Sequence, residues 1–220
     1  MALSVDQLID DLRQAADPVK AEGMSAYQKH RFAFFGVQTP ERRAIGRRFL
    51  LDAKHATVGE IFAAVEQLYA QPQRECHYLA IDLLERSYRR FRYQEFQLLY
   101  PLIDRHAWWD SVDALRKVIS LWVKGHPQYL NEVMERLLAA DSIWQRRVAI
   151  TLQLLWKEQT DTAWLCRAIL SNIDEGEFFI QKAIGWALRD YAKTNPAWVR
   201  RFLARHQLSK LAVREGSKHL

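Results

Sequence analysis

Apolar helical segments recur along this chain of 220 residues, and their spacing limits the possible folds more than any other feature. When Ile81, Ile119, Ile150 and Ile184 are taken as equivalent positions, successive offsets are 38, 31 and 34 residues. Periods of this length are typical of helical-hairpin arrays, in which each pair of helices buries its apolar face on its neighbours. The spacing predicts an all-α fold, a curved solenoid with a concave groove. Because the offsets are irregular, a single all-α bundle is the alternative.

The breaks between these segments are short and carry helix-capping residues. Such breaks lie at residues 125–127, 140–142, 159–161 and 194–196. In them, Asp, Ser, Thr or Asn can cap the next helix and Pro suits its first turn. With only 8 Gly and 6 Pro, the chain has no Gly/Ser/Pro-rich linker. We therefore expect a single domain over residues 1–220.

The cysteines and the apolar runs restrict the compartment and the kind of site. Cys76 and Cys166 have no partner at metal-ligand spacing, and no apolar run approaches the roughly 18 residues that a membrane span needs. The N-terminus lacks a basic region followed by an apolar stretch. We expect a reduced, cytoplasmic protein without a metal and without a membrane segment.

The charge balance indicates an anionic partner. Lys and Arg total 32 against 26 Asp and Glu, which gives a net charge of +6 and a pI near 9.4. Arginine outnumbers lysine, and its planar fork can bind two phosphate oxygens at once. Phosphate is therefore the anion that this composition favours.

The segment after Trp108 predicts a helix with an aromatic ring and a carboxylate one turn apart on its polar face. At roughly 100° per residue, one side of this helix carries Trp109, Asp113, Lys117, Ser120 and Lys124. The opposite, apolar side carries Leu115, Val118 and Trp122. A tryptophan among lysines indicates a ligand, although an ordinary salt bridge between Asp113 and Lys117 would also explain that pair.

A second helix, around residues 179–191, repeats this arrangement. Trp186 shares a face with Lys182, Arg189 and Lys193, opposite an apolar face with Ile180 and Ile184. The two outward tryptophans suggest a shared ligand. A neighbouring repeat or a dimer partner could also cover them.

Two further positions indicate anion chemistry. Arg147 falls on an apolar face of a helix expected over residues 143–156, where a guanidinium needs an anionic partner. Residues 36–43 read as a loop followed by a helix capped by Thr39. The free N–H groups of that helix, with Gln38, Thr39 and Arg43, could bind one phosphate, although an ordinary capped helix would look the same.

Four strings in order resemble the bacterial AlkD family of DNA alkylation-repair glycosylases. They are FFGVQTPERR at 34–43, WWDSVD at 108–113, IWQRR at 143–147 and FFIQKAIGWALRDYAKTNP at 178–196. The resemblance covers about residues 20–215. It implies a HEAT-like repeat fold whose concave basic groove binds double-stranded DNA. The sequence does not give the oligomeric state, and a monomer is the simpler expectation. The resemblance also implies excision of cationic N3- and N7-alkylated purines, such as 7-methylguanine and 3-methyladenine, without base flipping and without a cofactor.

The resemblance also assigns roles to individual residues. The catalytic aspartate falls on Asp113 and the active-site tryptophans on Trp109 and Trp186. The active-site arginine falls on Arg147 by its offset from Trp144, with Arg146 as the alternative because two arginines stand where the family has one. Positions near the DNA backbone are Tyr27, Gln38, Thr39, Arg43, Arg189 and Lys193.

Two other classes of function are compatible with a basic helical-repeat protein. One is a non-catalytic protein that binds distorted or branched DNA, and the other is a protein–protein scaffold. The joint presence of Trp109, Asp113, Arg147 and Trp186 favours the enzyme, because a pure binder has no reason to combine them.

Overall fold

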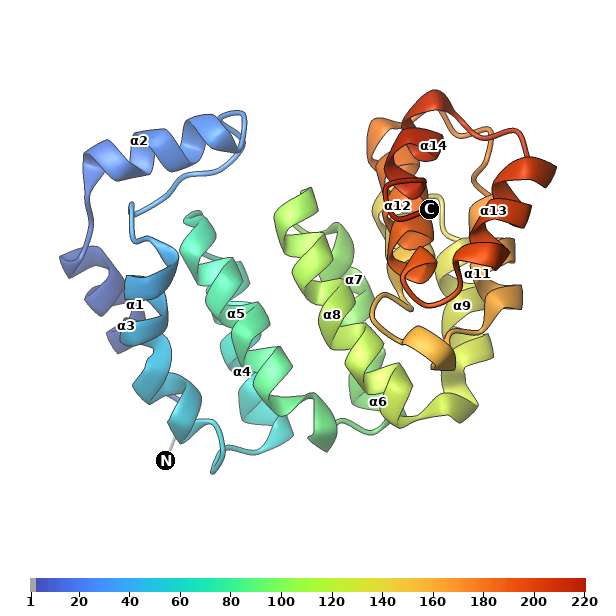
Figure 1. Cartoon of the computed structure of the whole chain (residues 1–220). Coiled ribbons are helices and arrows are strands. Elements are labelled where there is room, and N and C mark those ends of the chain that lie inside the picture. Colours follow the sequence, from blue (N-terminus) through green and yellow to red (C-terminus); the bar gives the residue numbers. More distant parts are fainter. Residues whose placement is uncertain (1–2) are drawn as a thin grey trace. The chain divides into compact units, whose positions relative to one another are not determined.

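The computed structural model describes residues 3–220, and most of them lie in helices (Figure 1). These residues contain no β-strand and a single isolated bridge, between Ala33 and Gln73. The chain divides into two compact units, Met1–Gln97 and Leu98–Leu220. The predicted all-α helical-repeat class is confirmed, whereas a single domain over 1–220 stays a prediction. No helix in residues 3–220 has the length and apolarity needed to cross a membrane.

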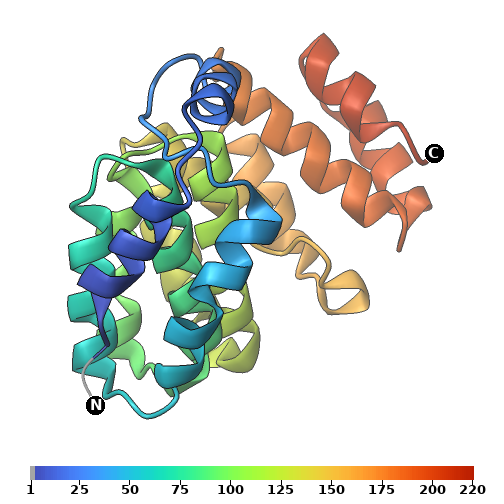
Figure 2. The same ribbon diagram turned by 90° about the vertical axis from the view of Figure 1, so that its left-hand side faces the viewer.

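The first unit is built around a hairpin of α4 and α5, with α3 packed on α5 and α1 on both α3 and α4 (Figure 2). A short 3-10 turn, Tyr88–Arg90, follows α5. The helices of this unit are α1 (Val5–Gln14), α2 (Pro18–Tyr27), α3 (Thr39–Asp52), α4 (Val58–Tyr69), α5 (Arg74–Ser87) and α6 (Tyr93–Phe96).

The second unit has α10 at its centre, in contact with α7, α8, α9, α11 and α12, while α12 also packs on α13 and α14. Short 3-10 turns at Pro127–Tyr129 and Lys157–Gln159 connect some of these helices. The helices are α7 (Leu99–Asp104), α8 (Trp109–Gly125), α9 (Leu130–Leu138), α10 (Ile143–Thr151), α11 (Thr162–Leu170), α12 (Phe178–Ala192), α13 (Pro196–Arg205) and α14 (Lys210–Gly216).

The expected capping residues begin three helices of the second unit. Ser142 Oγ accepts a hydrogen bond from Trp144 N–H at the start of α10. Asp161 and Asn195 do the same for the first turns of α11 and α13. On α8, the predicted apolar face is confirmed, since Leu115, Val118 and Trp122 are fully buried.

Two sequence-based expectations about helices are wrong because tertiary contacts override periodicity. The helix expected over 143–156 ends at Thr151, and Leu155 follows with a φ of 66° while its N–H donates to Asp190 Oδ2 at 2.8 Å. Ser120, assigned to the polar face of α8, is buried because its hydroxyl accepts a hydrogen bond from the Trp156 indole at 2.8 Å.

The approach of α14 to α12 depends on Gly185. A Cβ at this position would lie 2.5 Å from Glu215 Cβ and 3.1 Å from the Ala212 carbonyl oxygen. Real Cβ atoms do not approach this closely, and neither neighbour is the end of a flexible side chain. The absence of a side chain at Gly185 therefore sets how closely the last helix packs.

We predict that Gly185→Ala destabilises the protein by about 1–3 kcal/mol, because α14 must move away from α12. Denaturant unfolding measures this change. Gly125→Ala is the matched control, since a Cβ at Gly125 would meet nothing within 4 Å. A Gly185→Ala protein as stable as the wild type would contradict the close contact.

Candidate functional site

The centre of the candidate site is an ion pair between α8 and α10. Arg147 Nε donates to Asp113 Oδ1 at 2.9 Å and Arg147 Nη2 donates to Asp113 Oδ2 at 2.8 Å. This bidentate geometry fixes the plane of the carboxylate as well as its position. The Asp113 side chain stays 20% exposed, whereas that of Arg147 is only 6% exposed. The carboxylate is therefore oriented by a buried group and still accessible.

Arg147 also binds the start of α12. Its Nη1 donates to the Phe179 carbonyl oxygen at 2.6 Å. All three guanidinium nitrogens thus donate a hydrogen bond, two to Asp113 and one to the backbone. The anionic partner that the apolar surroundings of Arg147 required is Asp113.

The alternative arginine, Arg146, points to a different region. Its Nε donates to Asn172 Oδ1 at 2.9 Å and its Nη2 to Glu175 Oε2 at 2.7 Å, on the segment between α11 and α12. Its Nη1 donates to the Ala140 and Asp141 carbonyl oxygens. Arg146 therefore stabilises loops, and of the two neighbouring arginines Arg147 contacts Asp113.

The two tryptophans are half-buried rather than fully outward. Trp186, on α12, lies under two guanidinium groups, with its ring centroid 6.0 Å from Arg147 Cζ and 5.7 Å from Arg116 Cζ. Trp109 begins α8, one helical turn before Asp113. The structure thus joins Asp113, Arg147 and Trp186 by contacts and places Trp109 on the same helix as the carboxylate.

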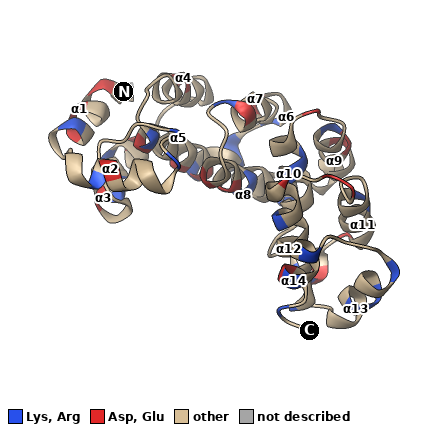
Figure 3. Ribbon diagram, turned by 90° about the horizontal axis from the view of Figure 1, so that it is seen from above, with Lys and Arg blue, Asp and Glu red and all other residues tan. Residues whose placement is uncertain are grey.

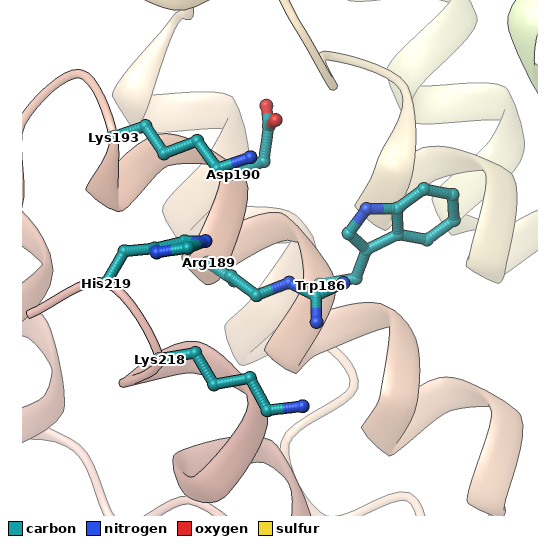
Figure 4. A pocket seen from close by; sticks show the side chains of 6 residues that line it. All are labelled: Trp186, Arg189, Asp190, Lys193, Lys218 and His219. Carbon is teal, nitrogen blue, oxygen red and sulfur yellow. The ribbon is translucent and has the colours of Figure 1, made fainter.

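A basic pocket opens beside Trp186 (Figure 4). Its volume is about 450 Å³. The predicted backbone-binding residues Arg189 and Lys193 line it from α12, together with Asp190. Lys218 and His219, from the segment after α14, line it as well and were not predicted. The pocket carries more positive than negative side chains, as an anion site requires.

A single buried carboxylate lies within the basic residues of α12 and α14, where both signs of charge occur (Figure 3). Glu215 is contacted by Lys218 Nζ at 2.8 Å, Lys182 Nζ at 3.2 Å and Arg189 Nη1 at 3.4 Å. Hydrogen bonds from Lys218 and Lys182 lower the pKa of Glu215 to about 2. Glu215 therefore holds Arg189 beside the pocket. Sequence periodicity missed it, because two of these cations lie on α12 and the third follows α14, whereas Glu215 itself lies on α14.

The other predicted backbone-binding residues, Tyr27, Gln38, Thr39 and Arg43, all lie in the first unit and are exposed. Tyr27 is 70% exposed at the end of α2. The prediction that Thr39 caps α3 is wrong by one position, because Gln38 is the N-cap and Thr39 the first helical residue. Within the described chain no side chain caps this helix start.

Sequence reasoning also missed the carboxylate that shapes the loop before α3. Glu75 is fully buried and accepts hydrogen bonds from the backbone N–H groups of Phe35, Gly36 and Val37 at 3.1, 2.9 and 3.1 Å. Gly36 has a φ of 92°, and a Cβ there would lie 2.0 Å from the Asp17 carbonyl oxygen. Glu75 and Gly36 together fix the loop that presents Gln38 and Thr39. The Gly within FFGVQTP was the one available signal.

Comparison with known proteins places this chain in a family. A family model described as "DNA alkylation repair enzyme" matches residues 8–220. A solved structure titled "Predicted DNA alkylation repair enzyme from Enterococcus faecalis" is 42% identical, with a TM-score of 0.91 over 93% of this chain and 96% of that one. The chain belongs to the DNA alkylation repair enzyme family.

Two more distant structures share the fold of this DNA alkylation repair family member. AlkD2 from Streptococcus mutans is 20% identical, with a TM-score of 0.65 over 80% of this chain and 88% of that one. The protein smu.31 from Streptococcus mutans UA159 is 18% identical, with the same TM-score over 95% and 99%. Comparison with curated protein sequences finds no match. The family assignment supports a role in DNA repair, with DNA as the partner.

The described residues offer no evident metal site. No group of three or more His, Cys, Asp or Glu side chains in residues 3–220 is arranged to hold a metal ion. Burial raises the pKa of the Cys76 thiol to about 12, so this cysteine is a core residue and not a nucleophile. The ionisable groups of the site are carboxylates, guanidinium groups, amines and the imidazole of His219.

We predict that Glu75→Gln lowers stability by about 1–3 kcal/mol, because an amide nitrogen would replace one oxygen that accepts a buried backbone N–H. Hydrogen exchange at the amides of residues 35–37, together with denaturant unfolding, measures this effect. Glu22→Gln, at an exposed position of the same unit, is the control. Unchanged exchange at these three amides would contradict the role assigned to Glu75.

We predict that the stability difference between wild type and Glu215→Gln depends on pH. Because the pKa of Glu215 is lowered to about 2 in the folded state from a usual value of 4.5, its stabilising contribution is complete above pH 4.5. That contribution is lost as the pH falls toward 2. Urea unfolding between pH 7 and pH 2 tests this, with Glu158→Gln as an exposed control in the same unit. A pH-independent difference would contradict it.

Proposed function

We propose that this protein is a monofunctional DNA glycosylase that excises cationic N3- and N7-alkylated purines from double-stranded DNA and leaves an abasic site for base excision repair. The observation that carries the proposal is the Asp113 carboxylate, oriented by a bidentate arginine and still accessible. Trp186 lies beside this pair and Trp109 one turn before it. The family membership supplies the DNA repair context.

The chemistry requires a carboxylate more than a general acid. Alkylation at N7 or N3 makes the purine cationic, so the base leaves without protonation. The barrier lies in the positive charge that develops on the deoxyribose as the glycosidic bond breaks. A fixed carboxylate beside that sugar stabilises this charge, and Asp113 can also orient or deprotonate the attacking water. The products are the free base and an abasic site.

The tryptophans complete the surroundings of the sugar in this proposal. Trp109 and Trp186 pack against the deoxyribose, and their π faces stabilise the developing positive charge. The Trp186 ring is already within 6.0 Å of the Arg147 Cζ atom, so this aromatic surface accommodates a cation in the free protein. The sequence pattern indicates no lysine nucleophile for Schiff-base chemistry, and we therefore propose that the strand is not cut.

Arg147 has two tasks in the proposal. Three of the five N–H groups of its guanidinium donate to Asp113 and to the Phe179 carbonyl, which leaves two for a DNA phosphate near the lesion. Its first task is to orient the carboxylate, and its second is to bind the backbone. A single buried residue would thus couple phosphate binding to the position of the catalytic group.

The remaining predicted residues bind the DNA backbone. Arg189 and Lys193 provide cations at the pocket beside Trp186, and Gln38, Thr39 and Arg43 provide donors at the start of α3. Tyr27 is an exposed donor at the end of α2. We propose that these contacts, made by a monomer, replace the insertion of a flipped base, so that no cofactor and no base-sized pocket is needed.

The competing proposal is a non-catalytic protein that binds distorted or branched DNA. The observation that favours it is the ion pair itself, because Arg147 neutralises part of the Asp113 charge in the free protein. In that case the pair would serve only to join α8 and α10. Binding without excision would distinguish it from the glycosylase.

We predict that Asp113→Asn lowers the single-turnover rate of 7-methylguanine excision by about 100-fold or more, because the fixed negative charge is lost. Binding to a duplex with an uncleavable abasic-site analogue should be retained. Asp110→Asn, on the first turn of the same helix, is the control for replacing a carboxylate by an amide. Equal rates for wild type and Asp113→Asn would reduce Asp113 to a structural ion pair.

The choice of lesion tests the same mechanism. Uracil in DNA is uncharged, so without protonation it must leave as an anion, whereas an alkylated purine leaves as a neutral base. A carboxylate alone gives little help to such a leaving group, and uracil should be a poor substrate. Excision of uracil as fast as 7-methylguanine would overturn the mechanism. Tight binding of the analogue duplex without excision of any alkylated purine would favour the non-catalytic protein.

A further inference from the structure

Arg116 is a buried arginine of the site to which neither the sequence strings nor the proposed mechanism gives a role. It lies on α8 three residues after Asp113 and is 9% exposed. Its Nε atom is inaccessible to solvent and has no hydrogen-bond acceptor among residues 3–220. Arg147, by contrast, donates from all three of its guanidinium nitrogens. Two buried arginines thus flank Trp186, and of these Arg116 has a buried nitrogen without an acceptor.

The charges around Arg116 make its position costly. Burial lowers the pKa of Arg116, and the charge of Arg147 lowers it further, while Asp113 and Asp190 act in the opposite direction. A buried donor without an acceptor is normally avoided, and a methionine of similar volume would fill this position without that cost. An arginine here is understandable if an anion contacts it during function.

The geometry indicates where that anion lies. Arg116 Cζ is 5.7 Å from the centroid of the Trp186 ring, and the same ring borders the basic pocket with Arg189 and Lys193. Asp113 is one turn away on the same helix, so an anion at Arg116 lies next to whatever faces the carboxylate. A guanidinium binds best to a group with two oxygens, such as a phosphodiester.

We propose that Arg116 binds a phosphodiester of the damaged DNA strand, next to the deoxyribose that faces Asp113. This inference rests on the proposed function, because the phosphate belongs to the nucleotide being excised or to its neighbour. In this proposal Arg147 and Arg116 have different roles. Arg147 positions the carboxylate with two of its five N–H groups, and Arg116 adds a second guanidinium whose Nε has no acceptor before DNA arrives.

The first experiment measures binding of the full chain to a duplex with an uncleavable abasic-site analogue as a function of salt. We expect Arg116→Met to bind about 10-fold more weakly. The slope of log K against log salt should fall in magnitude by about 0.9, the value for one lost phosphate contact. Arg116→Lys, which keeps the charge but not the fork, should recover the slope and part of the affinity. Thermal unfolding should show Arg116→Met to be as stable as the wild type or more stable.

A matched control removes a cation of the same unit without burial. Arg200→Met changes an exposed arginine on α13 and should leave both affinity and salt slope within twofold of the wild type. Loss of binding with retained stability at Arg116, but not at Arg200, would identify a ligand contact. A merely structural arginine would lower stability instead.

The second experiment locates the phosphate. Single neutral methylphosphonate linkages are placed one at a time around the abasic analogue, and binding is measured for wild type and Arg116→Met. We expect one linkage near the analogue to weaken wild-type binding about 10-fold and to have no further effect on Arg116→Met. Additive losses at every linkage would overturn the inference.

The outcomes separate this inference from the proposed function. If the wild type binds the analogue duplex but excises nothing, the glycosylase proposal fails, and the binding results still decide the role of Arg116. If the wild type excises 7-methylguanine and Arg116→Met and Arg116→Lys both match its affinity, salt slope and stability, the Arg116 inference fails alone.

Discussion

One buried guanidinium connects three helices of the second unit. Arg147 on α10 binds the carboxylate of Asp113 on α8 and the Phe179 carbonyl at the start of α12. Helix–helix packing alone leaves rotation about a helix axis weakly restrained, whereas a bidentate pair with a third bond restrains it in two directions. The accessible face of α8 and the position of Trp186 on α12 both depend on this one side chain. Breaking it would leave a charge buried without its partner, which costs far more than a surface ion pair.

The site concentrates positive charge that the free protein neutralises only in part. Arg147 has a carboxylate, and two cations of α12 share Glu215 with Lys218, but Arg116 keeps a buried donor without an acceptor. Such an excess is unfavourable for folding and favourable for binding an anion, because the binding free energy includes relief of that repulsion. The pocket beside Trp186 likewise carries more positive than negative side chains.

Much of the fold could be predicted from the sequence, because caps and apolar periodicity act locally. Leu115, Val118 and Trp122 are core residues as expected, and Ser142, Asp161 and Asn195 cap helices as expected. The failures involve contacts between distant segments. Ser120 is buried by Trp156, and α10 ends at Thr151 although its apolar pattern continues. The strings in the sequence identify Asp113 and Arg147 separately, but nothing in their spacing predicts that they bind each other. Arg116, Glu75 and Glu215 were missed for the same reason, since each acquires its meaning from residues on other helices.

The buried carboxylate of Glu75 limits which backbone N–H groups of the first unit can bind an external anion. Three successive amides of the loop before α3 already donate to Glu75, so they are not available to an external anion. The Glu75 carboxylate thus takes the place of an external anion at the N–H groups of residues 35–37. The next backbone N–H groups, from Gln38 onward at the uncapped start of α3, are the first that remain. Because Glu75 accepts the hydrogen bonds of residues 35–37, the backbone N–H groups open to an external anion begin at Gln38 and Thr39, two of the residues within the string FFGVQTPERR.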